Sequence, residues 1–535
     1  MDKTVPTVVP ALPPNGKGER KSSNFHPSLW GEFFLNYKPT TAPQHAWMKG
    51  RAEVLREEVR TILQGLKEIP ETLDLIMAIQ RLGLDMYYVN EINELLHFVY
   101  SSNYNDKDLN LVSLRFYLLR KNGYNMPCDN EGNFFVDDTR SLLSLYNAAT
   151  LRIHGEEVLD EAAIFTTSRL ETVSETSEPI LSKEVSFALE APIFRRARIV
   201  EMRNYIPIYE IETTRNETIL EFAKLNFNLL QLLYCEELNK ITLWWKELKA
   251  KSNLSFSRDR IVEMYFWMNG ALYEPQHTHS RIILTRMTAF MTIIDDIFDT
   301  YGITEESMQL AEAINRWDED AIGLLPEYIK GFYKYLLKTF DSFEEELGPE
   351  KRYRLKRLVQ AYSEELKWRD KDYVPKTLDE HFEVSMRSSG GSTLAGASFV
   401  GMDGIATKDI FEWILSYPSL FKSFDMFVRL SNDIASSKRE QTGDHYASTI
   451  QCYMKEHETT NHETCKKLKE LIEESWKDMV EHCINPTDEQ PLIVPHTVVN
   501  FARTVTNMYR HGDAFTSSHA IKEMIALLYV VPIQV

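Results

Sequence analysis

Three features are scarce in this sequence: basic charge, paired cysteines and long apolar runs. Lysine and arginine total 60 against 79 aspartates and glutamates, so the formal net charge is −19. That balance argues against a nucleic-acid surface, which needs a basic footprint, but it permits a small basic patch inside a pocket. The five cysteines are widely spaced and form no C-x-x-C pair. A disulfide framework or a zinc site is therefore not expected, and a reducing compartment fits.

Long apolar segments are also missing. No window approaches the roughly 18 uninterrupted apolar residues of a transmembrane helix, so we expect no membrane span. Residues 1–21 contain four prolines and no continuous apolar run, which argues against a secretory signal. The same stretch lacks the length and the serine and arginine richness of a plastid transit peptide. We therefore expect a cytosolic protein.

Helical periodicity dominates the chain, and strand-type alternation is scarce. Between residues 47 and 216, apolar residues recur about every 3.6 positions, as at Leu55, Val59 and Leu63. At 535 residues the chain is too long for one core. We predict an all-α protein of two helical domains, divided as follows: a flexible arm over residues 1–22, a first domain over 23–218 and a second domain over 219–535.

The segment Met291–Gly302 places three aspartates in otherwise apolar surroundings. On an α-helix Asp295 and Asp299 lie on one face, because they are four positions apart, and Asp296 lies roughly 100° away. Neighbouring carboxylates repel each other and resist burial. A divalent cation such as Mg²⁺ removes that cost, since it takes one or two carboxylates together with phosphate oxygens. The alternative is a solvated helix face rich in aspartate.

A second polar array follows in the segment Leu430–Glu440. Asn432, Ser436 and Glu440 are spaced by four residues, so their oxygens form one stripe about two helical turns long. A solvated helix shows the same spacing by chance. Two such arrays in one helical chain, however, indicate two helices that face each other across a cavity and hold Mg²⁺ against a shared polyphosphate.

The pair D-D-x-x-D and N-D-x-x-S-x-x-x-E resembles the metal-binding motifs of class I terpene synthases. The resemblance runs from Arg20 to the C-terminus and is greatest to plant sesquiterpene synthases, with grass-like stretches such as F-H-P-S-L-W-G and L-R-K-N-G-Y. It implies a catalytic C-terminal domain of the class I terpenoid synthase fold and an N-terminal α-barrel domain as structural support. It also implies Mg²⁺-dependent ionisation and cyclisation of farnesyl diphosphate, with release of diphosphate.

The resemblance further implies which residues act. Three Mg²⁺ ions are expected, with Mn²⁺ as an alternative, two of them held by Asp295 and Asp299 and the third by Asn432, Ser436 and Glu440. The catalytic group would comprise Asp295, Asp299, Trp267, Tyr509 and Asp513. Substrate contacts would come from Arg258, Arg260, Asp295, Asp299, Phe399, Arg429, Asn432, Arg439 and Phe515.

The arginines in this set would bind the departing diphosphate. Arg258 and Arg260 are two positions apart and would not share a helix face, so they suit a loop. Without further information, such a loop is typical of surface salt bridges. Arg258 stands 37 positions before Asp295, the spacing at which the family places its diphosphate-binding R-x-R loop. Arginine suits that role because it holds phosphate through two hydrogen bonds and keeps its proton. Asp433 is expected to support its neighbours.

The apolar wall of the cavity would come from three places. Trp267 is a core residue or a cation–π wall. The small residues of segment 388–401 weaken a helix, and the resemblance implies a kinked helix there whose residues 396–399 line the pocket; the alternative is a close helix contact. The segment around Tyr509, Asp513 and Phe515 is a candidate lid; many relatives have tyrosine where Phe515 stands. Arg20-Lys21 and Trp30 resemble the N-terminal R-R-x8-W element, with lysine for the second arginine, and receive no chemical role.

Three alternatives remain at this stage. A monoterpene synthase would use geranyl diphosphate in the same cavity. A chain-elongating prenyltransferase would carry two D-D-x-x-D arrays, and this chain has one. A non-catalytic helical scaffold would have lost metal ligands, and all five are present. The sequence encodes neither the product nor the oligomeric state, and we expect a monomer.

Overall fold

The computed structural model describes residues 25–37, 40–102, 104, 107–128, 136, 138–173, 179–252, 254–347, 350–399, 402, 407–440, 447–485 and 491–535. Within these ranges every regular element is a helix, so the all-α prediction is confirmed. None of the described helices is both long and apolar enough to cross a membrane. The predicted arm, including Arg20 and Lys21, lies outside the described residues.

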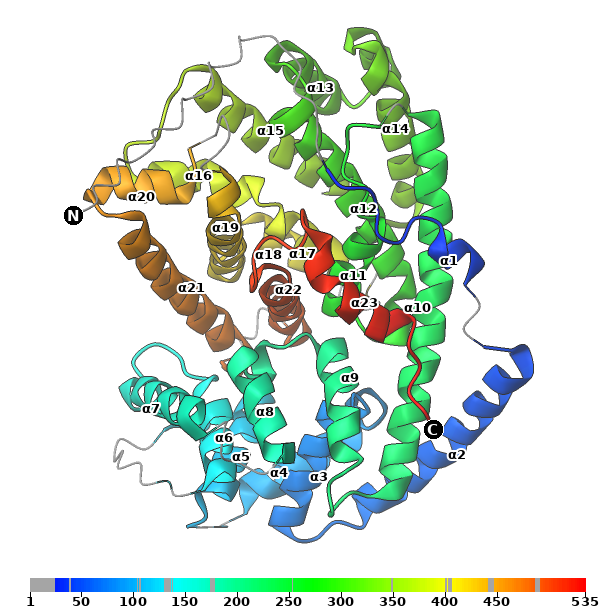
Figure 1. Cartoon of the computed structure of the whole chain (residues 1–535), viewed down its shortest axis with the longest axis vertical. Coiled ribbons are helices and arrows are strands. Elements are labelled where there is room, and N and C mark those ends of the chain that lie inside the picture. The colour runs from blue at the N-terminus through cyan, green and yellow to red at the C-terminus, as the bar shows by residue number, and fades with distance from the viewer. Residues whose placement is uncertain are drawn as a thin grey trace, which may run out of the picture.

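The first helical domain lies at the bottom of Figure 1, in blue, cyan and green. Its helices are α2 (Ala42–Gln64), α3 (Ile69–Arg81), α4 (Val89–Ser101), α5 (Leu109–Lys121), α6 (Thr139–Ala149), α7 (Glu157–Val173), α8 (Pro179–Glu190) and α9 (Arg198–Tyr209). Their apolar faces meet in a buried core, which includes Leu55, Leu73 and Leu118. Among the described residues this domain contains no group of metal-ligating side chains.

One long helix, α10 (Glu217–Lys251), runs through both domains (Figure 1). Asn216 starts it, because its side chain accepts a hydrogen bond from the Ile219 amide. The first turns face the lower domain, where Arg51 of α2 forms an ion pair with Glu221 at 2.6 Å. The predicted boundary at residue 218 therefore falls at the start of a helix that both domains share.

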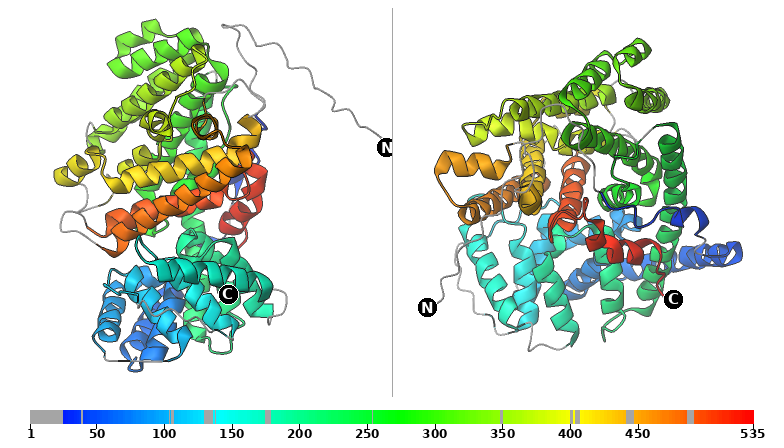
Figure 2. Two further views of the ribbon diagram at one scale, coloured as in Figure 1. Left: turned by 90° about the vertical axis from the view of Figure 1, so that its left-hand side faces the viewer. Right: turned by 45° about the horizontal axis from the view of Figure 1, so that its top comes forward.

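The second domain forms the upper part of the molecule (Figures 1 and 2). Its first half contains α11 (Ile261–Ala271), α12 (Thr278–Asp296), the π-helical turn η4 (Ile297–Tyr301), α13 (Thr304–Arg316), α14 (Glu327–Leu347), α15 (Glu350–Asp370) and α16 (Leu378–Ser388). Its second half contains α17 (Gly391–Ser398), α18 (Lys408–Leu415), α19 (Ser419–Glu440), α20 (Thr449–His457), α21 (Asn461–Ile484), α22 (Ile493–Tyr509) and α23 (Lys522–Tyr529).

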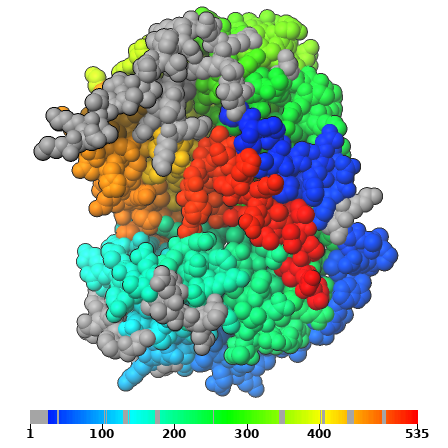
Figure 3. Space-filling model, in the orientation of Figure 1, coloured from blue at the N-terminus to red at the C-terminus, as the bar shows by residue number. Residues whose placement is uncertain are grey.

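The described N-terminal segment 25–37, with α1 (Phe33–Asn36), packs on the second domain. The Tyr37 hydroxyl donates to the Val530 carbonyl at 2.7 Å, and Asn239 of α10 donates to the Phe34 carbonyl at 3.0 Å. Figure 3 shows this segment in blue beside the C-terminal residues in red on one face of the molecule. The sequence prediction placed these residues with the first domain, whereas the structure places them beside the second.

Candidate active site

A cavity of about 410 Å³ opens among the helices of the second domain. Such a volume lies in the range of roughly 300–1,000 Å³ that is usual for small-molecule sites. The lining residues are Phe25, Arg258, Trp267, Thr288, Met291, Thr292, Asp295, Asp299, Thr300, Tyr362, Glu365, His381, Ser388, Ser389, Leu394, Val428, Arg429, Asn432, Asp433, Ala447, Ser448, Tyr509, Asp513 and Phe515. Both predicted polar arrays therefore contribute to one space.

The first array lies where α12 ends. Asp295 occupies the last α-helical turn, and the chain then continues as the π-helical turn Ile297–Tyr301, which contains Asp299. Single π-helical turns are rare and are frequent at functional sites. The prediction assumed a continuous α-helix between the two aspartates. The π turn alters that geometry, yet both carboxylates line the cavity.

Asp296, the middle aspartate, does not line the cavity. Its side chain is 1% exposed and accepts hydrogen bonds from the Ser257 hydroxyl and the Arg258 amide, both at 2.8 Å. Burial raises the pKa of Asp296, and the nearby Arg258 guanidinium opposes that shift. Asp296 thus ties the loop of Arg258 to the end of α12.

Arg258 carries a fixed positive charge into the cavity. Its Nη2 forms an ion pair with Asp295, and its Nε lies 2.8 Å from a carboxylate oxygen of Asp296. The guanidinium also lies between the rings of Phe25 and Phe515, 5.3 Å from each centroid. Although burial acts to lower it, the pKa of Arg258 is raised by the Asp296 and Asp295 carboxylates. The guanidinium is therefore oriented before any ligand arrives.

Arg260 was predicted to bind substrate, but the structure places it outside the cavity lining. Its side chain is fully buried and donates to three backbone carbonyls on terminal segments: His26 at 3.1 Å, Phe515 at 3.2 Å and Thr516 at 3.1 Å. In this arrangement Arg260 joins the N-terminal segment to the loop that carries Phe515.

The second array lies on α19. Asn432 lines the cavity, and its amide oxygen accepts a hydrogen bond from Arg429 Nη2 at 2.5 Å. Arg429 also forms a 2.5 Å ion pair with Asp433, whose other oxygen accepts from the Thr449 amide at 2.9 Å. Asp433 thus holds Arg429 and the start of α20 in place, and it also contributes to the lining.

The other residues predicted on this helix are Ser436, Arg439 and Glu440. Ser436 is 1% exposed, donates to the Asn432 carbonyl at 2.8 Å, and is not part of the lining. Arg439 and Glu440 belong to the last turn of α19, but their side chains lie outside the described residues.

The aromatic wall forms between α11 and the C-terminal loop. The Trp267 ring meets the Tyr509 ring edge-on at 6.0 Å and the Phe515 ring at 5.7 Å. Asp513 lines the cavity beside them. Edge-on packing of this kind is favourable between aromatic rings. Burial is the main cause that raises the pKa of Tyr509, so its hydroxyl stays protonated at neutral pH.

The segment that contains α17 lines the cavity with other residues than those predicted. It presents Ser388, Ser389 and Leu394 to the cavity, whereas residues 396–399 are not in the lining. Phe399 is fully buried in the core, and a Cβ on Gly396 would meet the Arg354 guanidinium on the other side of α17. Helix α17 therefore faces the cavity with another side than the one expected.

Glu365 of α15 was not predicted. Its carboxylate lines the cavity and accepts a hydrogen bond from the Ser388 hydroxyl at 2.6 Å. Burial raises the pKa of Glu365 to about 7, against the opposing charge of Arg429. A single glutamate in an amphipathic helix carries no motif, so only the fold brings it to the site.

The oxygen donors of this cavity fit Mg²⁺. Carboxylates and an amide oxygen line it on two sides, and these are the ligands a hard divalent cation prefers. Among the described residues no three histidine, cysteine or acidic side chains gather closely enough to form a metal cage by themselves. That arrangement suits a cation that completes its shell with water and phosphate oxygens.

Comparisons with known proteins agree with this geometry. Residues 29–189 match the family model "Terpene synthase, N-terminal domain", and residues 246–478 match "Terpene synthase family, metal binding domain". Over 96% of its length the chain is 62% identical to the β-sesquiphellandrene synthase of Sorghum bicolor (97% of that protein), and 61% to its zingiberene synthase (98%). An inactive sesquithujene synthase B of Zea mays is 58% identical, with 96% of each chain covered.

Two solved structures extend the comparison. Limonene synthase with 2-fluorolinalyl diphosphate is 29% identical, with a TM-score of 0.89 over 96% of this chain and all of that one. Grey poplar (Populus x canescens) isoprene synthase, with three Mg²⁺ ions and dimethylallyl-S-thiolodiphosphate, is also 29% identical, with a TM-score of 0.85 over 91% of this chain and 97% of that one. The chain belongs to the terpene synthase family.

Proposed function

We propose that this protein is a sesquiterpene synthase. It would ionise farnesyl diphosphate in a Mg²⁺-dependent reaction, cyclise the farnesyl cation and release diphosphate. The single observation that carries the proposal is the cavity itself, where cation-binding oxygens and two arginines meet an aromatic wall. The sesquiphellandrene and zingiberene synthases of Sorghum bicolor, which share about three fifths of its residues, support the C15 substrate.

The polar end of the cavity would bind the diphosphate. Asp295 and Asp299 on one side, and Asn432, Ser436 and Glu440 on the other, would hold Mg²⁺, with Mn²⁺ as an alternative. Bound there, the ions would supply positive charge to the leaving oxygen. Arg258 and Arg429 add fixed positive charge at the same end. Because the departing diphosphate gains negative charge in the transition state, charges fixed in place lower that barrier selectively.

The aromatic end would hold the carbocation. The face of an indole ring attracts a cation more strongly than that of phenol or benzene, and Trp267 lines the cavity. Tyr509 and Phe515 pack against Trp267 and help to exclude water. Since Tyr509 stays protonated and Phe515 has no hydroxyl, these two rings act as walls rather than as bases.

A product assay tests the proposal. Purified protein is incubated with farnesyl or geranyl diphosphate, with Mg²⁺ or with chelator, and volatiles are identified by gas chromatography and mass spectrometry. A metal-dependent C15 hydrocarbon or alcohol is expected. Turnover of geranyl diphosphate alone would instead make it a monoterpene synthase. No product from either substrate, in a folded sample, would favour the scaffold alternative and resemble the inactive maize relative.

The cytosolic location and the monomeric state belong to the same proposal. A fluorescent fusion expressed in plant cells would test the location. Size-exclusion chromatography with light scattering would test the oligomeric state against the 62.3 kDa of one chain.

A further inference from the structure

A second, smaller pocket lies on the side of α17 that faces away from the catalytic cavity. Its volume is about 30 Å³. The lining residues are Tyr353, Arg354, Arg357, Leu358, Arg387, Ser392, Thr393, Ile414, Leu415 and Tyr417, and none of them lines the catalytic cavity. Helix α17 separates the two spaces, since Ser392 and Thr393 face this pocket and Leu394 faces the other.

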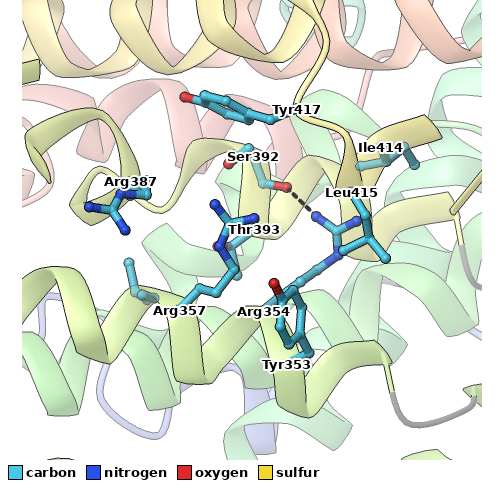
Figure 4. Close-up of a pocket in the computed structure, with 10 residues that line it drawn as sticks. Tyr353, Arg354, Arg357, Arg387, Ser392, Thr393, Ile414, Leu415 and Tyr417 are labelled. Atoms are coloured by element: carbon cyan, nitrogen blue, oxygen red, sulfur yellow. Dashed lines mark hydrogen bonds between the residues drawn. The ribbon is translucent and has the colours of Figure 1, made fainter. Parts of the chain in front are cut away.

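Three arginines converge on this pocket (Figure 4). Arg354 and Arg357 come from one face of α15, because they are three residues apart, and Arg387 comes from the last turn of α16. Figure 4 shows Arg357 between Arg354 and Arg387, with Tyr417 on the far side of Ser392.

Arg354 and Arg387 both have partners within the protein. Arg387 forms a 3.1 Å ion pair with Glu364 at the rim, and Arg354, which is 7% exposed, donates to the Ser392 carbonyl at 3.3 Å. The half-buried guanidinium of Arg357 lies 5.8 Å from the centroid of the Tyr353 ring and has no ion pair or hydrogen bond with any residue that the structure describes.

The nearest buried carboxylate, Asp425, is already engaged. It accepts hydrogen bonds from the Ser392 amide at 2.6 Å and the Tyr417 hydroxyl at 2.9 Å. Among the described contacts Asp425 forms no ion pair with the arginines. The pocket therefore concentrates positive charge in a partly desolvated place, where an anion is favoured.

We propose that this pocket binds a tetrahedral oxyanion of the phosphate class: inorganic phosphate or the terminal phosphoryl group of diphosphate. Its small volume favours a small anion or the end of a larger one. Guanidinium groups suit this ligand, since their planar fork matches two phosphate oxygens. Arg357 is the primary ligand, and Arg354 and Arg387 complete the site.

Calorimetric titration of the full-length protein with inorganic phosphate tests the proposal, in chelator and at low ionic strength. Arg357→Ala is expected to weaken binding about tenfold or more, because a hydrogen bond to a charged group is lost. Arg357→Lys should retain part of the affinity. The matched control is Arg258→Ala, which removes an arginine of the catalytic cavity and should leave phosphate binding intact.

Titration of diphosphate into the Arg258→Ala variant shows whether the pocket binds inorganic phosphate or the phosphoryl end of diphosphate. Diphosphate binding that Arg357→Ala weakens would identify the phosphoryl end of a larger ligand, and phosphate binding alone would identify the inorganic ion. Unchanged phosphate affinity in Arg357→Ala, or its loss in Arg258→Ala, would overturn the proposal. Melting curves for every variant show whether it is folded, and Arg387→Ala repeats the test if Arg357→Ala is not.

Discussion

Asp425 of α19 is the residue whose replacement tests most sharply how the cavity is shaped. Its fully buried carboxylate accepts one hydrogen bond from the Ser392 amide, in the first turn of α17, and another from the Tyr417 hydroxyl. Helix α17 is only eight residues long and brings Leu394 to the cavity. Asp425 therefore holds a cavity-forming helix without touching the cavity itself.

The magnitude follows from the two donors. Asp425→Ala leaves both of them unsatisfied, at about 1–3 kcal/mol each. Removal of a buried carboxyl group, whose desolvation is unfavourable, offsets part of this. We therefore expect the free energy of unfolding to fall by about 2–4 kcal/mol. Asp425→Asn should lose about 1 kcal/mol or less, because its amide oxygen still accepts from Ser392 while its NH₂ donates to Tyr417, whose hydroxyl rotates to accept.

The same carboxyl group predicts a pH dependence with a definite sign. Burial raises the pKa of Asp425 from 3.8 to about 7, against the hydrogen bonds it receives. Between these values the folded protein binds more protons at this site than the unfolded chain does. The contribution of Asp425 to the free energy of unfolding therefore falls as pH rises from about 4 to about 7, and is constant above that window. Asp425→Asn should remove this part of the slope.

Urea unfolding at pH 5 and pH 8 measures these free energies, and product analysis at neutral pH measures the effect on the cavity. Asp425→Ala is expected to lower stability and to change the ratio of products, whereas Asp425→Asn should keep the wild-type ratio. A loss below about 1 kcal/mol in Asp425→Ala together with an unchanged ratio would refute the reasoning. Equal losses in the two variants would show that charge, rather than hydrogen bonding, holds α17.

Three further predictions concern the catalytic cavity, and a fourth concerns the segments that Arg260 joins. Asp295→Ala should lower kcat by at least about a hundredfold with an unchanged circular dichroism spectrum, and full activity would exclude its role. Chelation of divalent ions should abolish turnover, and added Mg²⁺ should restore it. Trp267→Ala should lower kcat more than Trp267→Phe, which keeps an aromatic face. Arg260→Ala should lower the free energy of unfolding by about 3 kcal/mol and speed hydrogen exchange in segments 25–37 and 510–517. Arg215→Ala, which removes an exposed ion pair, should do neither.

The all-helical fold and the two polar arrays were predictable because each has a local signal. Apolar residues at helical spacing predict helices, and neighbouring carboxylates within an apolar helix resist burial unless opposite charge or hydrogen-bond donors compensate them. The structure accordingly brings Asp295, Asp299 and Asn432 to one cavity. Trp267, which the sequence predicts to be either a core residue or a cation–π wall, lines the cavity.

Side-chain direction in irregular segments was not predictable in the same way. The R-x-R loop contains two arginines of identical chemistry, and only tertiary contacts turn Arg258 to the carboxylates and Arg260 to the terminal segments. In α17, small residues on all sides give no apolar periodicity, so its cavity face was misjudged at residues 396–399. Glu365 lies in an ordinary charged helix and is recognised only from its neighbours.

The two adjacent aspartates of the first array have different surroundings, because a helix separates neighbouring side chains by roughly 100°. Asp295 faces the cavity, while Asp296 is buried behind it and binds the loop of Arg258 through an amide, a hydroxyl and an ion pair. Arg258 contacts both carboxylates through different nitrogens. If Asp295 were to bind a cation, Arg258 would keep Asp296 through Nε, and its Nη2 would become available to phosphate oxygens. The buried aspartate would then hold in place the positive charge that the cavity aspartate releases.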